Sequence, residues 1–422
     1  MAEATSREGS AAPVAVVVGL DCITGLQTAR ILHARGASVI GISSRRRHWA
    51  TYTRACEDVV VADLGSGNLT KALQDLRPRL GGRRAVLIPC TDPAVARLAA
   101  DQEVLRPWFV LPLGPLPLVQ TLMDKTSFAQ YAEDRGLPVP LTRVVGNEAE
   151  LADAARRLVF PLMLKPPAKS PEWDRVVGAK VIRVADARTL VSTYERVSAQ
   201  APAVVVQEII PGPETELYSC NAYFNASGQP LATFVARKLR QWPPDTGTSA
   251  SGIECRNDEV LDVTLKLFGE AGYHGLAYLE MKKHAETGRL LIVEPNVGRP
   301  TGRSAIAEAG GVELVWTAYC DAAGLPLPVN RTQQYGSARW LDLRRDLQAA
   351  FVARRKGTLT WGEWFSSARQ PTAHAIWSRQ DPAPFVVDVI QAGAKGLLGL
   401  LRALKDRAAH AVATAFPGSD VP

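Results

Sequence analysis

The sequence feature that most constrains the fold is a predicted β-hairpin in the third quarter of the chain. Two apolar segments, Gly275–Lys282 and Arg289–Asn296, flank a short polar turn that ends in Gly288. Glycine at the last position of a three-residue hairpin loop favours a left-handed residue at that point. The pattern therefore predicts two long antiparallel strands joined by a tight turn.

The predicted turn also sets the register of the hairpin. A three-residue loop pairs Ala285 with Arg289 and therefore places Glu280 opposite Glu294. Asn296 follows Glu294 on the same face, because alternate residues of a strand share a face. Facing carboxylates repel each other, so buried ones share a proton or hold a cation between them. An all-oxygen set of this kind suits Mg²⁺, which typically bridges to nucleotide phosphates.

The alternative is a pair of glutamates on an exposed face. We favour the metal site because the same strands carry many apolar residues. We expect Leu279, Met281, Leu291 and Val293 on the opposite face, with Tyr278 and Ile292 beside the acids.

Composition limits the class of protein. The chain has 422 residues, of which 46% are hydrophobic, enough for two or three packed domains. No secretory signal is recognisable, and the apolar run Val14–Leu20 is too short to span a bilayer. Six scattered cysteines without a CxxC pair argue against zinc and disulfides and favour a reducing cytoplasm.

The charge is moderately basic, at +7. From Arg331 onward, 13 basic residues stand against 7 acidic ones, so most of the excess lies near the C-terminus. No motif supports nucleic-acid binding, and we expect none. A basic surface facing an anionic substrate or membrane accounts equally well for the charge.

The first quarter of the chain alternates strand and helix signals. We predict strands at 14–20, 38–43, 58–63, 85–90 and 109–113, with helices at 24–35 and 69–76 between them. This βαβ rhythm predicts a parallel, Rossmann-like sheet. The loop Gly19–Gly25 lacks the GxGxxG spacing and no acidic residue ends the second strand, so we expect no dinucleotide there.

The middle of the chain predicts two further units. Residues 114–123 read as a proline-rich linker, followed by a helix at 124–135 and a small α/β unit with strands at 160–165, 179–184 and 203–210. An antiparallel set begins at Glu216 and continues through a polar Gly/Ser loop (245–252) and a helix (257–271) into the hairpin. Beyond 329 we predict a helix over 339–355 and a long terminal helix over 386–416.

Five motifs occur in an order that resembles the ATP-grasp ligases. They are MDKTSFAQYAEDRGLPVP (123–140), FPLMLKP (160–166), VVVQEIIPGPETEL (204–217), GLAYLEMK (275–282) and IVEPN (292–296). Within that superfamily, TRACEDVVVAD (53–63) and the tail over 339–385 resemble the carboxylate–amine ligases typified by D-aspartate ligase.

The resemblance implies an α/β fold, α+β in the ATP-grasp part. An N-terminal Rossmann-like parallel sheet precedes a two-lobed fold with an antiparallel core sheet and a helical C-terminal extension. The expected boundaries are a disordered tail (1–12), a first domain (13–118), the ATP-grasp domain (119–328, small lobe about 145–210) and the extension (329–422).

The resemblance also implies residue roles. Lys125 and Lys165 would bind the nucleotide phosphates, and Lys238 would reach the β- and γ-phosphates. The hinge that contacts adenine would be formed by Gln207, Glu208, Ile209 and Ile210. Either Glu214 or Glu216 would bind the ribose. Lysine suits phosphates because it is a compact cation. The implied ligands are ATP and Mg²⁺, as two ions held by Glu280, Glu294 and Asn296, with Mn²⁺ as a substitute.

Three arginines are candidates for the catalytic step. The resemblance assigns Arg256, Arg299 or Arg303 to the substrate carboxylate or reaction intermediate. Two departures stand out. Val297 and Gly298 separate Asn296 from the arginine, and the loop 166–178 lacks the several glycines that many relatives carry over the triphosphate; Lys169, Ser170 or Lys180 could substitute there.

The implied activity is an ATP-dependent ligation of a small-molecule carboxylate to an amine through an acyl phosphate. Amino acids, short peptides and cell-envelope precursors are the expected substrates. A carboxylating ATP-grasp enzyme and a nucleotide-binding module without turnover remain alternatives.

The terminal segment 386–416 has an apolar stripe with lysine and arginine mostly off it. It predicts either docking onto the protein itself, the reading we favour, or peripheral contact with an anionic membrane. A homodimer through the first domain is a further assembly that the sequence leaves open.

Overall fold

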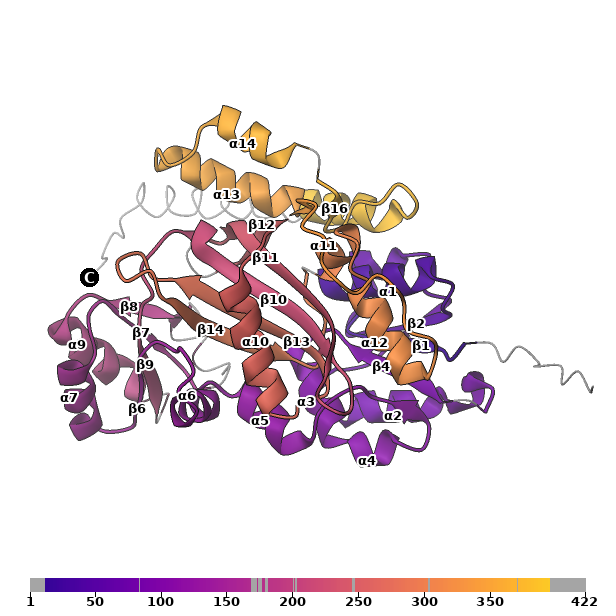
Figure 1. Ribbon diagram of the computed structural model, residues 1–422, viewed down its shortest axis with the longest axis horizontal. Coiled ribbons are helices and arrows are strands. Elements are labelled where there is room, and N and C mark those ends of the chain that lie inside the picture. Colours follow the sequence, from indigo (N-terminus) through magenta and orange to yellow (C-terminus); the bar gives the residue numbers. More distant parts are fainter. Residues whose placement is uncertain are drawn as a thin grey trace, which may run out of the picture.

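The computed structural model describes residues 12–394, except 83, 168–172, 174–176, 179–180, 200, 202, 245–246, 303 and 370. Nearly all of the expected disordered tail, the predicted helix beyond residue 394, and Lys169, Ser170, Lys180 and Arg303 lie outside the described residues. Three sheets organise the rest, with one at each end of the molecule and the largest between them (Figure 1).

The N-terminal sheet is parallel and has the order β3-β2-β1-β4-β5, as the βαβ pattern predicts. Its strands are β1 (Ala15–Val18), β2 (Val39–Ser43), β3 (Asp58–Val61), β4 (Ala85–Pro89) and β5 (Phe109–Val110). The connecting helices are α1 (Ile23–Ala34), α2 (Gly67–Asp75), α3 (Asp92–Ala100) and α4 (Gln102–Leu105). Both faces of the sheet are buried, which explains the continuous apolar strands.

The predicted linker is wrong, because residues 116–123 form a helix, α5 (Leu116–Met123). Pro115 precedes the helix and Pro117 lies in its first turn, where a missing N–H costs nothing. Val119 and Leu122 are buried against the central sheet. The helix α6 (Lys125–Asp134) follows at once, capped by Asp124, whose side chain accepts from the N–H groups of Thr126 and Ser127.

A small antiparallel sheet of order β6-β9-β7-β8 forms the predicted small lobe. Its strands are β6 (Thr142–Val145), β7 (Leu162–Lys165), β8 (Ile182–Val184) and β9 (Val204–Glu208). The helices α7 (Glu148–Arg157) and α9 (Ala187–Ser198) cover one face and enclose a core that includes Leu162 and Val206. The other face, which carries Lys165 and Gln207, has no such helical cover among the described core residues.

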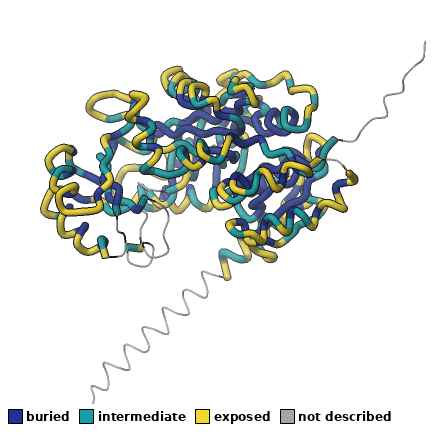
Figure 2. The backbone as a smooth tube through the Cα atoms, turned by 90° about the horizontal axis from the view of Figure 1, so that it is seen from below, coloured by how far each residue is buried: buried dark blue, intermediate teal, exposed yellow. Residues whose placement is uncertain are grey.

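The central sheet has seven strands in the order β14-β13-β10-β11-β12-β15-β16, antiparallel except for the last pair. The strands are β10 (Leu217–Phe224), β11 (Pro230–Trp242), β12 (Thr248–Glu254), β13 (Gly275–Lys283), β14 (Leu290–Val297), β15 (Arg339–Leu341) and β16 (Ala373–His374). The helix α10 (Asp258–Glu270) packs on one face with α5 and α6. Figure 2 shows the buried strands running through the interior of the molecule.

Two of the sequence predictions for this region need correction. The predicted polar loop at 245–252 is largely strand β12, because small side chains such as Ser251 and Gly252 fit a strand paired on both sides. The helix predicted over 339–355 begins only at Leu343, since residues 339–341 pair with β12 as β15.

The C-terminal extension packs against both larger sheets. It contains α13 (Leu343–Arg355), α14 (Trp361–Ala368) and a helical stretch at 383–394, which starts three residues before the predicted position. Asp381 accepts a hydrogen bond from Arg30 of α1 at 2.9 Å. The short helices α11 (Ser304–Ala309) and α12 (Leu314–Ala323) also pack on α1. These contacts join the N-terminal domain to the part of the chain that follows the central hairpin.

Candidate nucleotide and metal site

The hairpin places Glu280 opposite Glu294, as predicted, but by a different route. His284 and Arg289 close the turn, so the loop has one residue more than expected. A bulge near Val293 then shifts the register back by one residue. The two departures cancel at the acids. They also place Ile292, rather than the predicted Leu291 and Val293, in the core beside Met281.

Glu280 is buried and already compensated. Its Oε1 accepts from Lys238 Nζ at 2.6 Å and its Oε2 accepts from Tyr278 Oη at 2.6 Å. Lys238 Nζ also donates to Gln241 Oε1 at 3.2 Å. These contacts fix the carboxylate on the face of the central sheet that carries Tyr278, since residues two apart share a face.

Glu294 is exposed, in contrast to its partner across the strands. Its Oε1 accepts from Asn296 Nδ2 at 3.3 Å, which places both side chains on one face as predicted. Arg299 donates to Asn296 Oδ1 and, at 2.5 Å, to Asp92 Oδ1 at the start of α3. The end of β14 is thus tied to the carboxyl edge of the parallel sheet.

Gly298 explains the departure from the usual spacing before the arginine. Its φ is +73°, and a Cβ there would lie 2.5 Å from Leu113 and 2.9 Å from Val95. The extra residues therefore let the chain turn in close contact with the N-terminal domain before Arg299.

The pKa of Lys165 responds to two nearby charges of opposite sign. Burial, and after it the Lys125 cation, lower the pKa of Lys165 to about 8, while the Glu294 carboxylate opposes the shift. Lys165 Nζ donates to Gln207 Oε1 at 2.9 Å, and Gln207 in turn donates to Thr142 at 2.7 Å. The structure therefore brings Lys125, Lys165 and Gln207 together with Glu294, from both lobes.

The other hinge residue, Glu208, faces away from this group. Its register partner Leu162 belongs to the small-lobe core, and its Oε1 accepts from Val159 N at 2.8 Å. Ile209 N donates to Pro161 O at 3.3 Å, and Ile210 is buried. The carboxylate of Glu208 is thus not brought together with Lys165.

The two ribose candidates lie in a short turn before β10. Glu214 Oε2 accepts from Gln241 N at 3.1 Å, so this residue is joined to the strand segment that carries Lys238. Glu216 Oε2 accepts from Tyr218 Oη at 3.0 Å. The contact with Gln241 connects Glu214, rather than Glu216, to the residues around Glu280.

The structure does not bring Arg256 to the acids. Its side chain is 69% exposed, pairs with Asp258 at 3.0 Å and lies 5.7 Å from the Tyr335 ring. Arg256 follows strand β12, which β10 and β11 separate from β13 in the sheet. Arg303 lies outside the described residues, so Arg299 is the predicted arginine that contacts the site.

Sequence reasoning missed three residues around the site. Tyr278, which the sequence placed beside the acids, does contact Glu280. Gln241, Thr142 and Asp92 give no local signal; they reach the site through strand pairing or domain packing.

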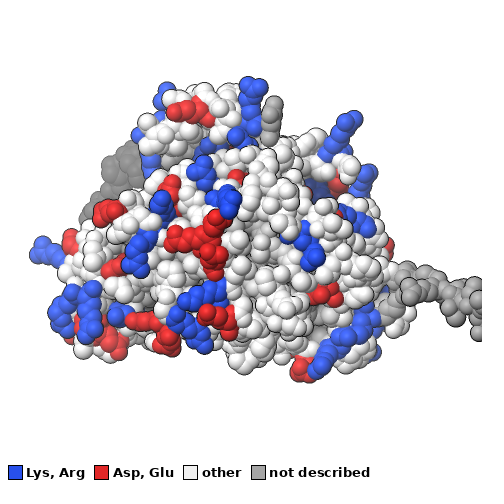
Figure 3. All heavy atoms as spheres, in the orientation of Figure 1, with Lys and Arg blue, Asp and Glu red and all other residues white. Residues whose placement is uncertain are grey.

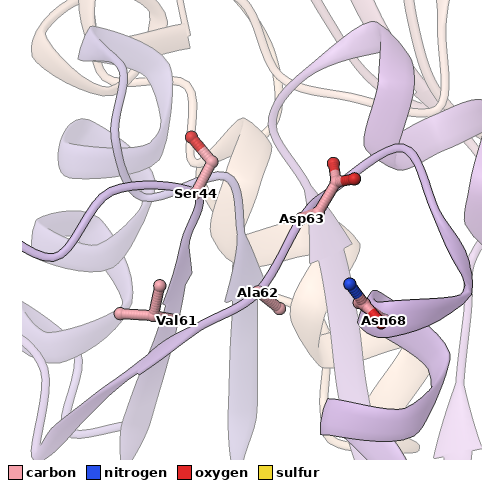
Figure 4. Close-up of a pocket in the computed structure, with 5 residues that line it drawn as sticks. All are labelled: Ser44, Val61, Ala62, Asp63 and Asn68. Carbon is pink, nitrogen blue, oxygen red and sulfur yellow. The ribbon is translucent and has the colours of Figure 1, made fainter.

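A separate pocket of about 430 Å³ lies at the carboxyl ends of β2 and β3 (Figure 4). It is lined by Ser44, Val61, Ala62, Asp63 and Asn68, none of which is a predicted nucleotide-binding residue. The candidate site therefore rests on the converging side chains between the lobes and not on this pocket.

Comparison with protein families finds no matching family model. A D-aspartate ligase of Enterococcus faecium is 25% identical over 234 residues, which cover 53% of this chain and 54% of the relative. A D-alanine–D-alanine ligase of Stutzerimonas stutzeri is 33% identical over 181 residues, covering 41% of this chain and 54% of that enzyme. The chain thus spans about half the length of these relatives.

Solved structures share the fold. An N5-carboxyaminoimidazole ribonucleotide synthetase in complex with ADP superposes with a TM-score of 0.61 at 17% identity, covering 78% of this chain and 81% of that one. The biotin carboxylase domain of a Hydrogenobacter thermophilus 2-oxoglutarate carboxylase, solved with MgADP and bicarbonate, gives a TM-score of 0.59 at 14% identity, covering 76% and 72%. All four proteins are members of the ATP-grasp superfamily, and this chain shares the fold of the two solved structures, with a parallel N-terminal sheet followed by antiparallel sheets.

Proposed function

We propose that this protein is an ATP-dependent carboxylate–amine ligase. The observation that carries the proposal is the placement of Lys165 beside a second cation, Lys125, and near Glu294. Burial is the main cause of the lowered pKa of Lys165, and repulsion by the Lys125 cation adds to it. A bound triphosphate removes the repulsion, and the nearby acids offer oxygen ligands for the Mg²⁺ that accompanies it.

The donor set fits the metal. Glu280, Glu294 and Asn296 supply only oxygen ligands from one face of a hairpin, and directly paired residues have Cβ atoms about 5 Å apart. These residues would hold one or two Mg²⁺ ions, or Mn²⁺, which neutralise charge on the β- and γ-phosphates. Lys238 is then released from Glu280 or shares it with the metal.

The chain's own residues would position the reaction. The substrate carboxylate attacks the γ-phosphorus, ADP leaves, and an acyl phosphate forms. An amine then attacks the acyl carbon, and phosphate departs from the tetrahedral intermediate with loss of a proton from nitrogen. Arg299, fixed by Asp92 and Asn296, is the described arginine placed to stabilise the developing oxyanion.

The substrate class follows from the ligase relatives. These relatives are a D-aspartate ligase and a D-alanine–D-alanine ligase, which are named for amino acids. We propose an amino acid, a short peptide or a cell-envelope precursor as the carboxylate or the amine.

A carboxylating reaction is the second candidate, favoured by the structural neighbours. One of them was solved with bicarbonate in addition to MgADP. Bicarbonate would then take the place of the organic carboxylate, and carboxyphosphate would replace the acyl phosphate.

The test is phosphate release from MgATP across a panel of amino acids, singly and in pairs, with and without bicarbonate. The ligase proposal predicts release that needs both an acid and an amine and that falls at least a hundredfold in Glu294→Gln. Release that depends on bicarbonate alone supports the second candidate. Nucleotide binding without release under any condition contradicts both.

A further inference from the structure

The exposed apolar side chains of this protein gather in its C-terminal extension. Nine of the nineteen large apolar residues exposed in the described chain lie between residues 343 and 390, although this stretch is short. They are Leu343, Leu347, Phe351, Trp361, Phe365, Trp377, Val386, Val389 and Ile390. Scattered exposed apolar residues need no explanation, but a concentration of this kind marks an interaction surface.

The inner face of α13 packs against the central sheet. Asp346 is completely buried and accepts from Arg240 of β11 at 2.7 and 3.0 Å. It also accepts from Trp364 Nε1 of α14 at 2.8 Å, which holds the two helices side by side. Ala349 and Ala350 are buried on the same face. The opposite face of α13 is therefore left to solvent.

The outer face of α13 combines an apolar stripe with arginines. Leu343, Leu347 and Phe351 follow one another at intervals of four and are 42%, 39% and 54% exposed. Arg354 and Arg355 are exposed beside this stripe, whereas Arg344 pairs with the buried Asp388 at 3.2 Å. The single acidic residue of α13 is Asp346, which points inward, so the outer face of this helix carries only positive charge.

The neighbouring helix α14 adds two aromatic side chains. Trp361 is 42% and Phe365 is 62% exposed, one helical turn apart. Its acid, Glu363, accepts from the Thr360 backbone and hydroxyl in a capping box. Figure 3 shows basic side chains projecting at this end of the molecule beside an acidic group. We call the exposed residues of the two helices, Leu343, Leu347, Phe351, Arg354, Arg355, Trp361 and Phe365, the α13–α14 surface.

We propose that the α13–α14 surface binds the headgroup region of an anionic phospholipid membrane. Apolar and aromatic side chains enter the boundary between headgroups and acyl chains, while flanking arginines pair with lipid phosphates. No helix in the described part of the chain is long and apolar enough to cross a membrane, so the contact is peripheral. The inference does not depend on the proposed catalytic function.

The positive charge of the α13–α14 surface favours an anionic membrane over a second copy of the chain as its binding partner. A symmetric dimer through this surface would place the same patch on both subunits. Arginines would then face arginines without an outer acid on α13 to pair with them. An anionic headgroup layer complements the same charges, and basic residues near such a surface contribute roughly 1 kcal/mol each.

The test is sedimentation of the full chain with phosphatidylglycerol vesicles and with phosphatidylcholine vesicles, each at low and high salt. We expect binding to the anionic vesicles that weakens with salt. Phe351→Ser with Phe365→Ser, and separately Arg354→Gln with Arg355→Gln, should each weaken it by on the order of tenfold or more. Val329→Ser is the matched control, since Val329 is 92% exposed outside the surface and should leave binding unchanged.

Folding is checked separately by the melting temperature and by MgATP binding, which the surface variants should preserve. A second pair, Leu397→Ser with Leu401→Ser, tests the terminal segment. Binding lost in that pair but kept in both surface variants would overturn the proposal. So would absence of vesicle binding, or a dimer of the wild type that the surface variants dissociate.

Discussion

Lys238 Nζ lies 2.6 Å from Glu280 Oε1, and both side chains are buried in the central sheet. A cation therefore already compensates one of the two facing acids, while Glu294 remains exposed. Two acids facing each other across a hairpin led us to expect a metal between them. If Mg²⁺ binds here as we propose, it would compete with Lys238 for Glu280.

Removal of Lys238 should destabilise the metal-free protein and weaken turnover. Lys238→Met removes the cation from Glu280, which keeps its hydrogen bond from Tyr278, and breaking a buried ion pair in this way typically costs about 3 kcal/mol. Mg²⁺ with ADP should restore part of this loss, because the metal replaces the missing positive charge. Chemical unfolding with and without MgADP measures both effects.

Lys283→Met is the matched control for that experiment, because Lys283 ends β13, the strand that carries Glu280, but is exposed. It should change the free energy of unfolding by less than about 0.5 kcal/mol. Equal effects of the two variants would mean that the Lys238–Glu280 contact does not stabilise the protein.

Nucleotide affinity should fall as the pH rises above about 8. Lys165 has its pKa lowered to about 8 by burial and by Lys125, so it is charged below this pH and neutral above it. Bound phosphate favours the charged form, so affinity is fully present below pH 8 and declines by up to about tenfold per pH unit above it. Calorimetric titration of ADP at several pH values measures this decline.

Two variants test whether deprotonation of Lys165 causes the decline in affinity. Lys165→Arg should flatten the decline because arginine stays charged. Lys125→Gln should move its onset to higher pH, since it removes a charge that lowers the pKa of Lys165. A pH profile unchanged in both variants would contradict the assignment of Lys165 to the phosphates.

The sequence predicted the three sheets and the facing acids because those features follow from local patterns. Apolar runs mark the parallel strands, and alternation across the hairpin marks Glu280 and Glu294. Even there, the predicted register agrees with the structure only because a longer turn and a bulge offset each other.

The rest depends on contacts between distant segments. The sequence predicts a loop at 245–252, because its small polar side chains give no strand signal, but pairing with β11 and β15 makes Thr248–Glu254 a strand. Asp92 reaches Arg299 only because the N-terminal domain packs against the end of β14. No spacing within one segment encodes such a contact.

Gly298→Ala should destabilise the protein and reduce turnover. The new Cβ would meet buried Leu113 and Val95 and would sit at a φ of +73°, which together cost about 2 to 4 kcal/mol. Arg299 follows directly and should be displaced. Gly357→Ala is the control, with a φ of +72° and no atom within 4 Å, so it carries the backbone strain alone. Equal losses in the two variants would contradict the close approach.

Stability should also depend on pH through Glu308. Burial raises the pKa of Glu308 to about 7, with Arg35 and backbone N–H groups only partly opposing it. The folded protein then holds this proton more tightly than the unfolded chain. The contribution is fully present below about pH 4.5 and is lost as the pH rises to 7, at no more than about 1.4 kcal/mol per pH unit.

Urea unfolding between pH 5 and pH 8 tests this contribution. Glu308→Gln cannot titrate, so its stability should change less over this range than that of the wild type. Glu103→Gln, at an 82% exposed side chain, should keep the wild-type slope. A slope that Glu308→Gln leaves unaltered would show that another group controls the pH dependence.

The most direct test of the account is equilibrium binding of ATP with and without Mg²⁺, in the wild type, Lys165→Gln and Glu294→Gln. The account predicts saturable binding that Mg²⁺ strengthens. Lys165→Gln should weaken binding at least tenfold in either condition, and Glu294→Gln should remove most of the strengthening by Mg²⁺ while the protein stays folded. Absence of ATP binding, or binding that neither substitution alters, would contradict a nucleotide site between the two lobes.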